Sequence, residues 1–265
     1  MRVRFRFTKL GKVRFTSHRD VARLWERALR RAGLPVASTA GVNPRPKVHF
    51  GLALPTGHES LGEYLDVDFR PDEADTLDVE ALPELLTPLL PIGLDVETAA
   101  VIERSGLSLQ EAVISCSWRI GLVAPIDPSS AGWSNPVPDP DHATARAAVA
   151  ALLAADHLPV TRERKGKVVE DDIRPAVLEL GVADASHPGD FDRADNPVIL
   201  ECRLATQPRG IRPAELVATL STFAATPLDE GPVTRTHQWI ALDGALAEPL
   251  PPGATRATHA QARAS

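Results

Sequence analysis

The stretch Val3-Arg4-Phe5-Arg6-Phe7-Thr8 sets the pattern for the amino-terminal part of the chain. Apolar and polar side chains alternate along it, and a period of two places successive side chains on opposite faces of a β-strand. The pattern therefore predicts an apolar inner face and a cationic outer face. A turn at Gly11 would let the chain return as a second strand through Val13 and Phe15.

A helix is expected directly after this pair of strands. Ser17 or Asp20 can cap its first turn, and Gly33 followed by Pro35 closes it. Apolar residues recur at helical spacing between these points, and arginines crowd the complementary side. The apolar set is Val21, Leu24, Trp25, Ala28 and Leu29, and the basic set is Arg19, Arg23, Arg27, Arg30 and Arg31.

The order of the remaining elements predicts the fold. Strands at residues 48–54, 64–69 and 94–101, with a helix at 79–90, give the order β-α-β-β-α-β. The order recurs in strands 113–123, 198–205 and 233–242, helices 143–154 and 213–223, and a hairpin around Gly166 within residues 160–174. We therefore predict an α+β fold of two tandem ferredoxin-like (split β-α-β) domains with antiparallel sheets.

The expected domain boundaries follow from this repeated order. The first domain would span residues 1–108 and the second residues 109–243, and a disordered tail would occupy residues 244–265. Within the second domain, residues 125–141 and 184–197 are expected to be irregular because they are rich in turn-forming residues.

Charge is distributed very unevenly along the chain. The first fifty residues hold thirteen Lys and Arg against Asp20 and Glu26, a formal charge of +11 in a chain whose total is −6. Such a surface is suited to meeting an anion. The alternative is a solvated basic face that is balanced by residues 51–110, which hold thirteen acids and two arginines.

Composition excludes several classes of protein. Cys116 and Cys202 each lie in an apolar, strand-like run, so we expect buried thiols rather than a disulfide or a metal site. No window approaches the roughly 18 apolar residues of a membrane span, and the basic amino terminus does not resemble a signal peptide. We predict a cytoplasmic protein without a metal or a cofactor.

Several motifs carry a family resemblance. They are Val13-Arg14-Phe15-Thr16-Ser17-His18-Arg19-Asp20, Gly41-Val42-Asn43-Pro44-Arg45-Pro46-Lys47, Leu54-Pro55-Thr56-Gly57-His58-Glu59-Ser60 and Gly62-Glu63-Tyr64-Leu65-Asp66. They resemble the radical-SAM-linked family of uncharacterised bacterial proteins, most strongly over residues 1–70 and more weakly to about residue 240. Members resemble a domain fused to, or encoded beside, cobalamin-dependent radical SAM proteins, which implies a radical SAM enzyme as partner.

The resemblance implies an accessory role rather than the radical reaction itself. The chain lacks the three closely spaced cysteines that hold the iron–sulfur cluster of radical SAM enzymes. The doubled ferredoxin-like order is also similar to CRISPR-repeat-processing endoribonucleases, but only at the level of fold. Their glycine-rich loop near the carboxyl terminus has no match here.

The strongest candidate site combines the helix start with a proline-rigid loop. It comprises His18, Arg19, Asn43, Arg45, Lys47 and His49. Arginine offers a planar fork and lysine a point charge, so these residues would suit a phosphate or the backbone of RNA. The alternative is that Asn43 and the flanking prolines serve only as a structural turn.

Two further basic groups extend this prediction. They are Arg162, Arg164, Lys165 and Lys167, and then Arg203, Arg209 and Arg212. All three groups in one cleft would give a continuous path for RNA, although the second group also fits a simple hairpin tip. The aromatic content of 5% argues against broad recognition of single strands. We interpret four other arginines as part of the electrostatic field around the site rather than as site residues: Arg4, Arg6, Arg23 and Arg27.

His18 and His49 are the candidate catalytic residues. With Lys47 either one could act as general acid or base in a metal-independent ribonuclease, although a hydrogen-bonding role for His18 at the helix end is favoured. Metal binding by His49, His58, Glu59 and Glu63 is disfavoured because their spacing fits no compact motif. The leading hypothesis is a non-catalytic RNA-binding or substrate-presenting accessory protein. An endoribonuclease and a protein–protein adaptor are the alternatives.

Overall fold

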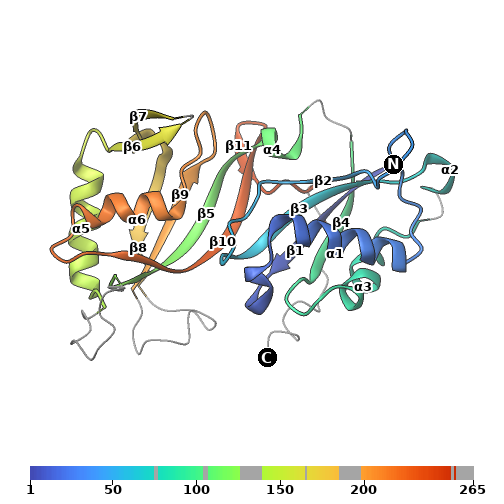
Figure 1. Cartoon of the computed structure of the whole chain (residues 1–265), viewed down its shortest axis with the longest axis horizontal. Coiled ribbons are helices and arrows are strands. Elements are labelled where there is room, and N and C mark those ends of the chain that lie inside the picture. The colour runs from blue at the N-terminus through green and yellow to red at the C-terminus, as the bar shows by residue number, and fades with distance from the viewer. Residues whose placement is uncertain are drawn as a thin grey trace. The chain divides into compact units, whose positions relative to one another are not determined.

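The chain is divided into two compact units. The computed structural model describes residues 1–74, 77–103, 107–125, 139–164, 166–184, 198–251 and 254 (Figure 1). Unit 1 comprises residues 1–114 and 235–265, and unit 2 comprises residues 115–234. The strand β10 (Asp229–Leu242) contributes residues to both units. The boundary predicted at residue 243 would place all of this strand in the second domain. Instead, its residues are divided between the two units.

Unit 1 is built on an antiparallel sheet. Its strands are β1 (Arg2–Lys9), β2 (Val48–Phe50), β3 (Glu59–Asp68) and β4 (Val96–Ile102), and the order is β4-β1-β3-β10 with β2 also paired to β3. Phe5 of β1 lies opposite Leu65 of β3 and Ala99 of β4. The apolar face predicted for β1 is confirmed, because Phe5 is fully buried and Phe7 is only 2% exposed. The opposite face is not a solvated cationic one along its whole length, because Arg6, Thr8 and Lys9 are buried as well.

The helix α1 (His18–Arg31) covers one face of this sheet (Figure 1). Its Trp25 is fully buried and packs against Phe5 and Phe7, with ring centroids 5.6 and 5.0 Å apart. Burial of each such side chain stabilises the fold by about 1.5–3 kcal/mol. The predicted cap is confirmed, because Ser17 Oγ accepts a hydrogen bond from the Asp20 amide at 3.2 Å. Packing and capping thus fix the direction in which the helix presents its polar side.

The predicted strand through Val13 and Phe15 is wrong. Residues Gly11–Phe15 form a 3-10 helix, η1, which Gly11 enters with φ of 65°. Both edges of β1 are already paired, with β3 and β4, so a strand returning at this point would have no free edge to join. The hydrogen bond from the Gly57 amide to the Arg14 carbonyl holds η1 in place.

The predicted helix at residues 79–90 is shorter than expected. It consists of α3 (Leu82–Leu86) followed by the 3-10 turn η2 (Thr87–Leu89). Pro88 lacks the amide hydrogen that a continuing α-helix needs, so the last turn tightens. Unit 1 also contains the single-turn helices α2 (Pro71–Ala74) and α4 (Leu109–Ala112).

The end of β10 continues into a further strand. Leu242 pairs with Ala245, the first residue of β11 (Ala245–Ala247). Asp243 and Gly244 connect them with φ of 49° and 79°, as a tight hairpin turn requires. The prediction of disorder from residue 244 is therefore wrong at its start, and Asp-Gly was the signal that identifies the turn.

Unit 2 has strands in the order β10-β5-β9-β8. These are β5 (Val113–Val123), β8 (Val177–Val182) and β9 (Ile199–Ala205), accompanied by the helices α5 (His142–Ala154) and α6 (Pro213–Ser221) and the 3-10 turn η3 (Arg174–Ala176). A separate hairpin joins β6 (Pro159–Arg164) to β7 (Lys167–Asp172) around Gly166, as predicted. The α+β class with antiparallel sheets is confirmed, while the ferredoxin-like detail stays a prediction.

Other expectations can be placed on this fold. Cys116 and Cys202 are buried thiols as predicted, and burial raises the pKa of the Cys202 thiol. No helix in the described part of the chain is long and apolar enough to cross a membrane. The segments expected to be irregular, 125–141 and 184–197, lie mostly outside the described residues. The parts not described are residues 126–138 and 185–197.

Candidate anion-binding surface

The outer face of β1 is neutralised by neighbouring strands. Each of its arginines pairs with a carboxylate: Arg2 with Asp68, Arg4 with Asp66 and Arg6 with Glu97. The antiparallel register between β1 and β3 places the first two pairs directly opposite each other. The Arg4 pair is bidentate, at 2.6 and 2.8 Å, which is the strong geometry for a guanidinium and a carboxylate. These arginines support the sheet and offer little free charge to a ligand.

A second set of basic groups is buried inside unit 1. Arg235 is 1% exposed and donates to Glu63 at 2.7 Å and to the Leu52 carbonyl at 2.9 Å. Lys9 is 2% exposed and donates to the Arg14 carbonyl at 3.1 Å. Burial lowers the pKa of Lys9, an effect that the nearby Glu63 opposes. These cations are internal and cannot contact an anionic polymer.

The two candidate catalytic histidines do not converge. His18 is exposed at the start of α1, and its ring meets the edge of Phe50 at 5.2 Å between centroids. His49 instead places Nε2 3.5 Å from Asp68 Oδ2. Side chains alternate along an extended strand, so Phe50 faces α1 while its neighbour faces the other side. The two histidines are therefore not brought together, and the alternative of a ribonuclease in which either one acts with Lys47 stays a prediction.

The proline-containing loop has an ordered backbone. The Thr39 amide donates to the Arg45 carbonyl at 2.8 Å, and the Arg45 amide returns a bond to Thr39 Oγ1 at 3.0 Å. The Lys47 amide donates to the Ala37 carbonyl at 2.8 Å. Asn43 is exposed within the loop so formed. No ion pair involves the side chains of Arg45 and Lys47 among the described residues.

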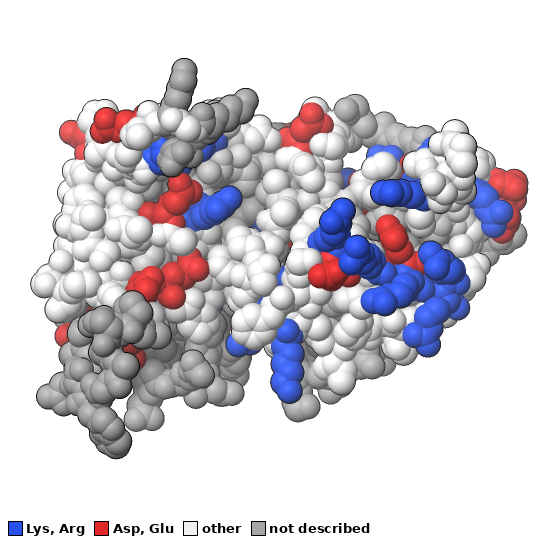
Figure 2. Space-filling view, viewed as in Figure 1, with Lys and Arg blue, Asp and Glu red and all other residues white. Residues whose placement is uncertain are grey.

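Among the described residues, unneutralised charge is concentrated on α1. We call Arg19, Arg23, Arg27 and Arg31 the α1 arginine stripe. They are spaced by four residues, so they lie on one face of the helix and span about 18 Å. All four are exposed. In the described structure only Arg23 pairs with a carboxylate, Asp20, at 3.1 Å. Figure 2 shows Lys and Arg side chains gathered over this helix.

The stripe includes residues that the sequence analysis placed outside the site. Arg19 was assigned to the site, whereas Arg23 and Arg27 were interpreted as surrounding field and Arg31 was not assigned. The spacing of four residues was visible in the sequence and was the signal for this face. What the sequence did not reveal is that the arginines of β1 are paired and those of α1 largely are not.

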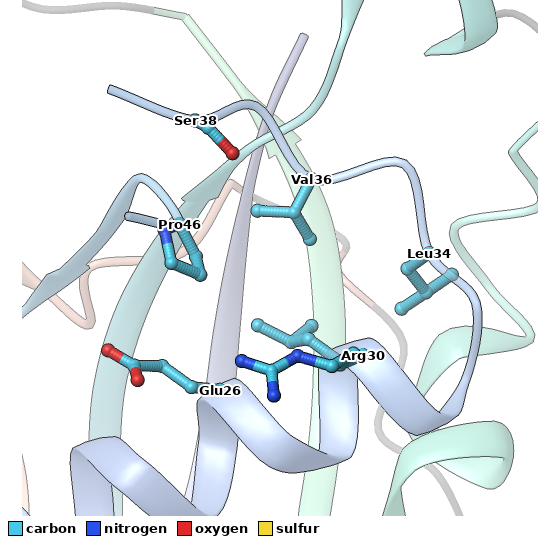
Figure 3. Close-up of a pocket in the computed structure, with 7 residues that line it drawn as sticks. Glu26, Arg30, Leu34, Val36, Ser38 and Pro46 are labelled. Carbon is cyan, nitrogen blue, oxygen red and sulfur yellow. The ribbon is translucent and has the colours of Figure 1, made fainter. Parts of the chain in front are cut away.

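A small pocket lies beside the stripe. It is about 140 Å³ in volume and is lined by Glu26, Leu29, Arg30, Leu34, Val36, Ser38 and Pro46. Figure 3 shows Glu26 and Arg30 projecting from α1, with Val36, Ser38 and Pro46 on the opposite side. The pocket is therefore formed where the helix meets the segment that follows it.

The basic groups of unit 2 are largely paired. Arg162 contacts Asp171 at 2.6 Å, Arg203 contacts Glu179 at 2.7 Å and Arg209 contacts Glu215 at 2.6 Å. Arg212 is exposed at the start of α6. Lys165 and the side chains of Arg164 and Lys167 lie outside what the structure describes. The predicted path joining all three basic groups stays a prediction.

Comparisons with known proteins give a family and a distant structural likeness. The family described as "Uncharacterized protein conserved in bacteria (DUF2344)" matches residues 2–213. Among curated proteins, no match is found. A chain in the "Crystal Structure of a Cbf5-Nop10-Gar1 Complex" is similar, with 6% identity and a TM-score of 0.46 over 89% of this chain and 48% of that one. The present chain thus spans about half the length of the chain it matches.

Proposed function

Because the chain belongs to the DUF2344 family of uncharacterized bacterial proteins, whose description names no activity, we propose a function from the surface itself. The protein binds the phosphate backbone of RNA through the α1 arginine stripe. It acts in the cytoplasm as a non-catalytic accessory that presents RNA to a partner enzyme. The radical SAM identity of that partner rests on the motif resemblance alone.

The single observation that carries this proposal is the contrast in pairing. Arg19, Arg27 and Arg31 are exposed without carboxylate partners in the described structure, and they lie along one oblique row on the exposed side of α1. A guanidinium group binds phosphate through two parallel hydrogen bonds. Because the helix is packed on the sheet through Trp25, its backbone is ordered before the ligand arrives, and only the arginine side chains have to become ordered on binding.

The experiment compares two variants with the same change in charge. The double variant Arg27→Gln and Arg31→Gln removes the carboxyl-terminal half of the stripe and retains good helix formers. The matched control, Arg70→Gln and Arg146→Gln, removes two exposed arginines that pair with Glu73 and Asp184. Filter binding with total tRNA and with single-stranded RNA at low salt gives the affinities.

We expect the stripe variant to lose at least tenfold in affinity, since the loss of even one charge-assisted hydrogen bond of about 1.5 kcal/mol corresponds to about tenfold. The control should stay close to wild type. Equal losses in both variants would show that the affinity for RNA depends on net charge and not on the stripe. Absence of RNA binding by wild type at low salt would overturn the proposal. A pull-down repeated after nuclease treatment separates RNA binding from a protein–protein adaptor.

A further inference from the structure

The interior of the pocket beside the stripe is mostly apolar. Leu29 of α1 is 1% exposed, and Leu34, Val36 and Pro46 form the remaining apolar wall. An isolated bridge between Val36 and Phe69 ties this wall to the sheet, so it does not depend on the loop alone. The volume of about 140 Å³ is below the roughly 300 Å³ at which drug-sized ligand sites begin. It suits one flat ring rather than a whole nucleotide.

Two opposite charges stand at the same wall of this pocket. Glu26 and Arg30 are four residues apart on α1, a spacing at which such side chains ordinarily attract each other. Across the described residues, neither side chain makes an ion pair or a hydrogen bond. Figure 3 shows both beside the cavity, with Ser38 opposite. The pocket therefore combines an accepting carboxylate and a donating guanidinium that are both available.

This combination discriminates among nucleobases. Guanine presents adjacent N1 and N2 hydrogens that a carboxylate accepts, and its O6 and N7 accept from an arginine fork. Adenine and cytosine each place a ring acceptor beside their single amino group, and this acceptor repels a carboxylate. Uracil has one N–H between two carbonyl groups. Guanine alone offers paired donors to Glu26 while accepting from Arg30.

The position of the pocket favours a base that belongs to a bound strand. Arg27 and Arg31 of the stripe are each one residue away from Glu26 and Arg30 along α1. A backbone held by the stripe would bring its bases within reach of the adjoining face of the helix. Building on the proposed function, we infer that this pocket takes one unpaired guanine of the bound RNA.

The test measures base preference with matched oligonucleotides. Four single-stranded RNA 8-mers of uridine carry G, A, C or U at one central position, and fluorescence anisotropy gives each affinity. Wild type should bind the G oligomer roughly tenfold more tightly than the others, the low end of what one bidentate base contact gives. Glu26→Gln should lose most of this preference while keeping its affinity for the all-uridine oligomer.

Control variants separate the pocket from the general charge. Glu80→Gln removes an exposed carboxylate outside the pocket and should retain the preference for G. Circular dichroism checks that each variant is folded. Equal binding of the four oligomers by wild type overturns the inference and leaves backbone binding by the stripe intact. A G preference that survives Glu26→Gln overturns it as well.

A direct titration covers the case in which no RNA binds. Isothermal calorimetry with 5′-GMP and 5′-AMP then probes the pocket without the stripe. A preference for GMP that disappears in Glu26→Gln supports the guanine site although backbone binding has failed. Equal or undetectable binding of both nucleotides overturns the guanine site, while the proposed function is already overturned by the absence of RNA binding.

Discussion

The arginines of β1 and of α1 have similar density in the sequence but opposite roles in the structure. Arg2, Arg4 and Arg6 alternate along a strand and meet carboxylates on the neighbouring strands. The arginines of α1 recur every fourth residue on the exposed side of a helix, where only Arg23 has a carboxylate partner among the described residues. A basic run in a sequence therefore indicates a binding surface only where the fold leaves its charges unpaired.

The largest effect on stability is expected from Arg4→Ala. The change leaves Asp66, whose side chain is 3% exposed, without its bidentate partner. Removal of one partner from a buried ion pair destabilises a protein by about 3–5 kcal/mol, so the free energy of unfolding should fall by about 3 kcal/mol. Urea denaturation measures it. The affinity for RNA at a temperature where the variant is folded should not change, and a loss there would mean that β1 also contacts the ligand.

The α1 stripe should show the reverse behaviour. The double variant Arg27→Gln and Arg31→Gln should change the free energy of unfolding by less than about 0.5 kcal/mol, because both side chains are exposed and unpaired in the described structure. Its RNA affinity should nevertheless fall by about tenfold. Urea denaturation and filter binding on one preparation give both values. A large loss of stability would show that the stripe is structural.

Ser17→Ala tests how much the N-terminal cap of α1 contributes to the stability of the protein. Ser17 Oγ accepts from the Asp20 amide and donates to Asp20 Oδ2 at 2.7 Å, and this second bond lowers the pKa of Asp20. Loss of an N-cap should cost about 1 kcal/mol in thermal or urea unfolding. Ser17→Asp retains a capping oxygen and should cost less. Equal losses in the two variants would show that capping does not explain the effect.

The smallest effect is expected in unit 2 and depends on pH. Hydrogen bonds from His157, the Leu158 amide and the Arg174 amide lower the pKa of Asp172 to about 2. A carboxyl whose pKa is lowered by folding contributes stability above its unfolded pKa, and the contribution is lost as pH falls toward 2. Wild type should therefore melt slightly higher than Asp172→Asn at pH 6, and the difference should shrink as pH falls from about 4 to 2 and vanish only below pH 2. A constant difference would exclude this titration as the cause.

Local patterns in the sequence were sufficient for α1 and β1. Ser17 caps the helix as expected, and Phe5 and Phe7 face the core as their alternation predicted. Each of these features depends on residues within a few positions of one another. Nearby sequence also contained the signal for the β10–β11 turn, Asp243-Gly244, although it was overlooked.

Pairing across the sheet could not be predicted in this way. Asp66 and Asp68 belong to a stretch that alternates clearly, yet their ion pairs with Arg4 and Arg2 depend on the register between β1 and β3. A shift of one residue would turn those carboxylates to the other face. The pocket likewise depends on how the segment around Pro46 packs against α1, which no periodicity encodes. The candidate site thus follows from long-range contacts.

The most direct test of the central claim is the salt dependence of RNA binding. Three guanidinium groups that each neutralise one phosphate should give a slope of log K against log salt of about −2 on single-stranded RNA, at about −0.7 for each phosphate. The triple variant Arg19→Gln, Arg27→Gln and Arg31→Gln should lose most of this slope. The same slope in wild type and variant would contradict the claim that the α1 arginine stripe binds the RNA backbone.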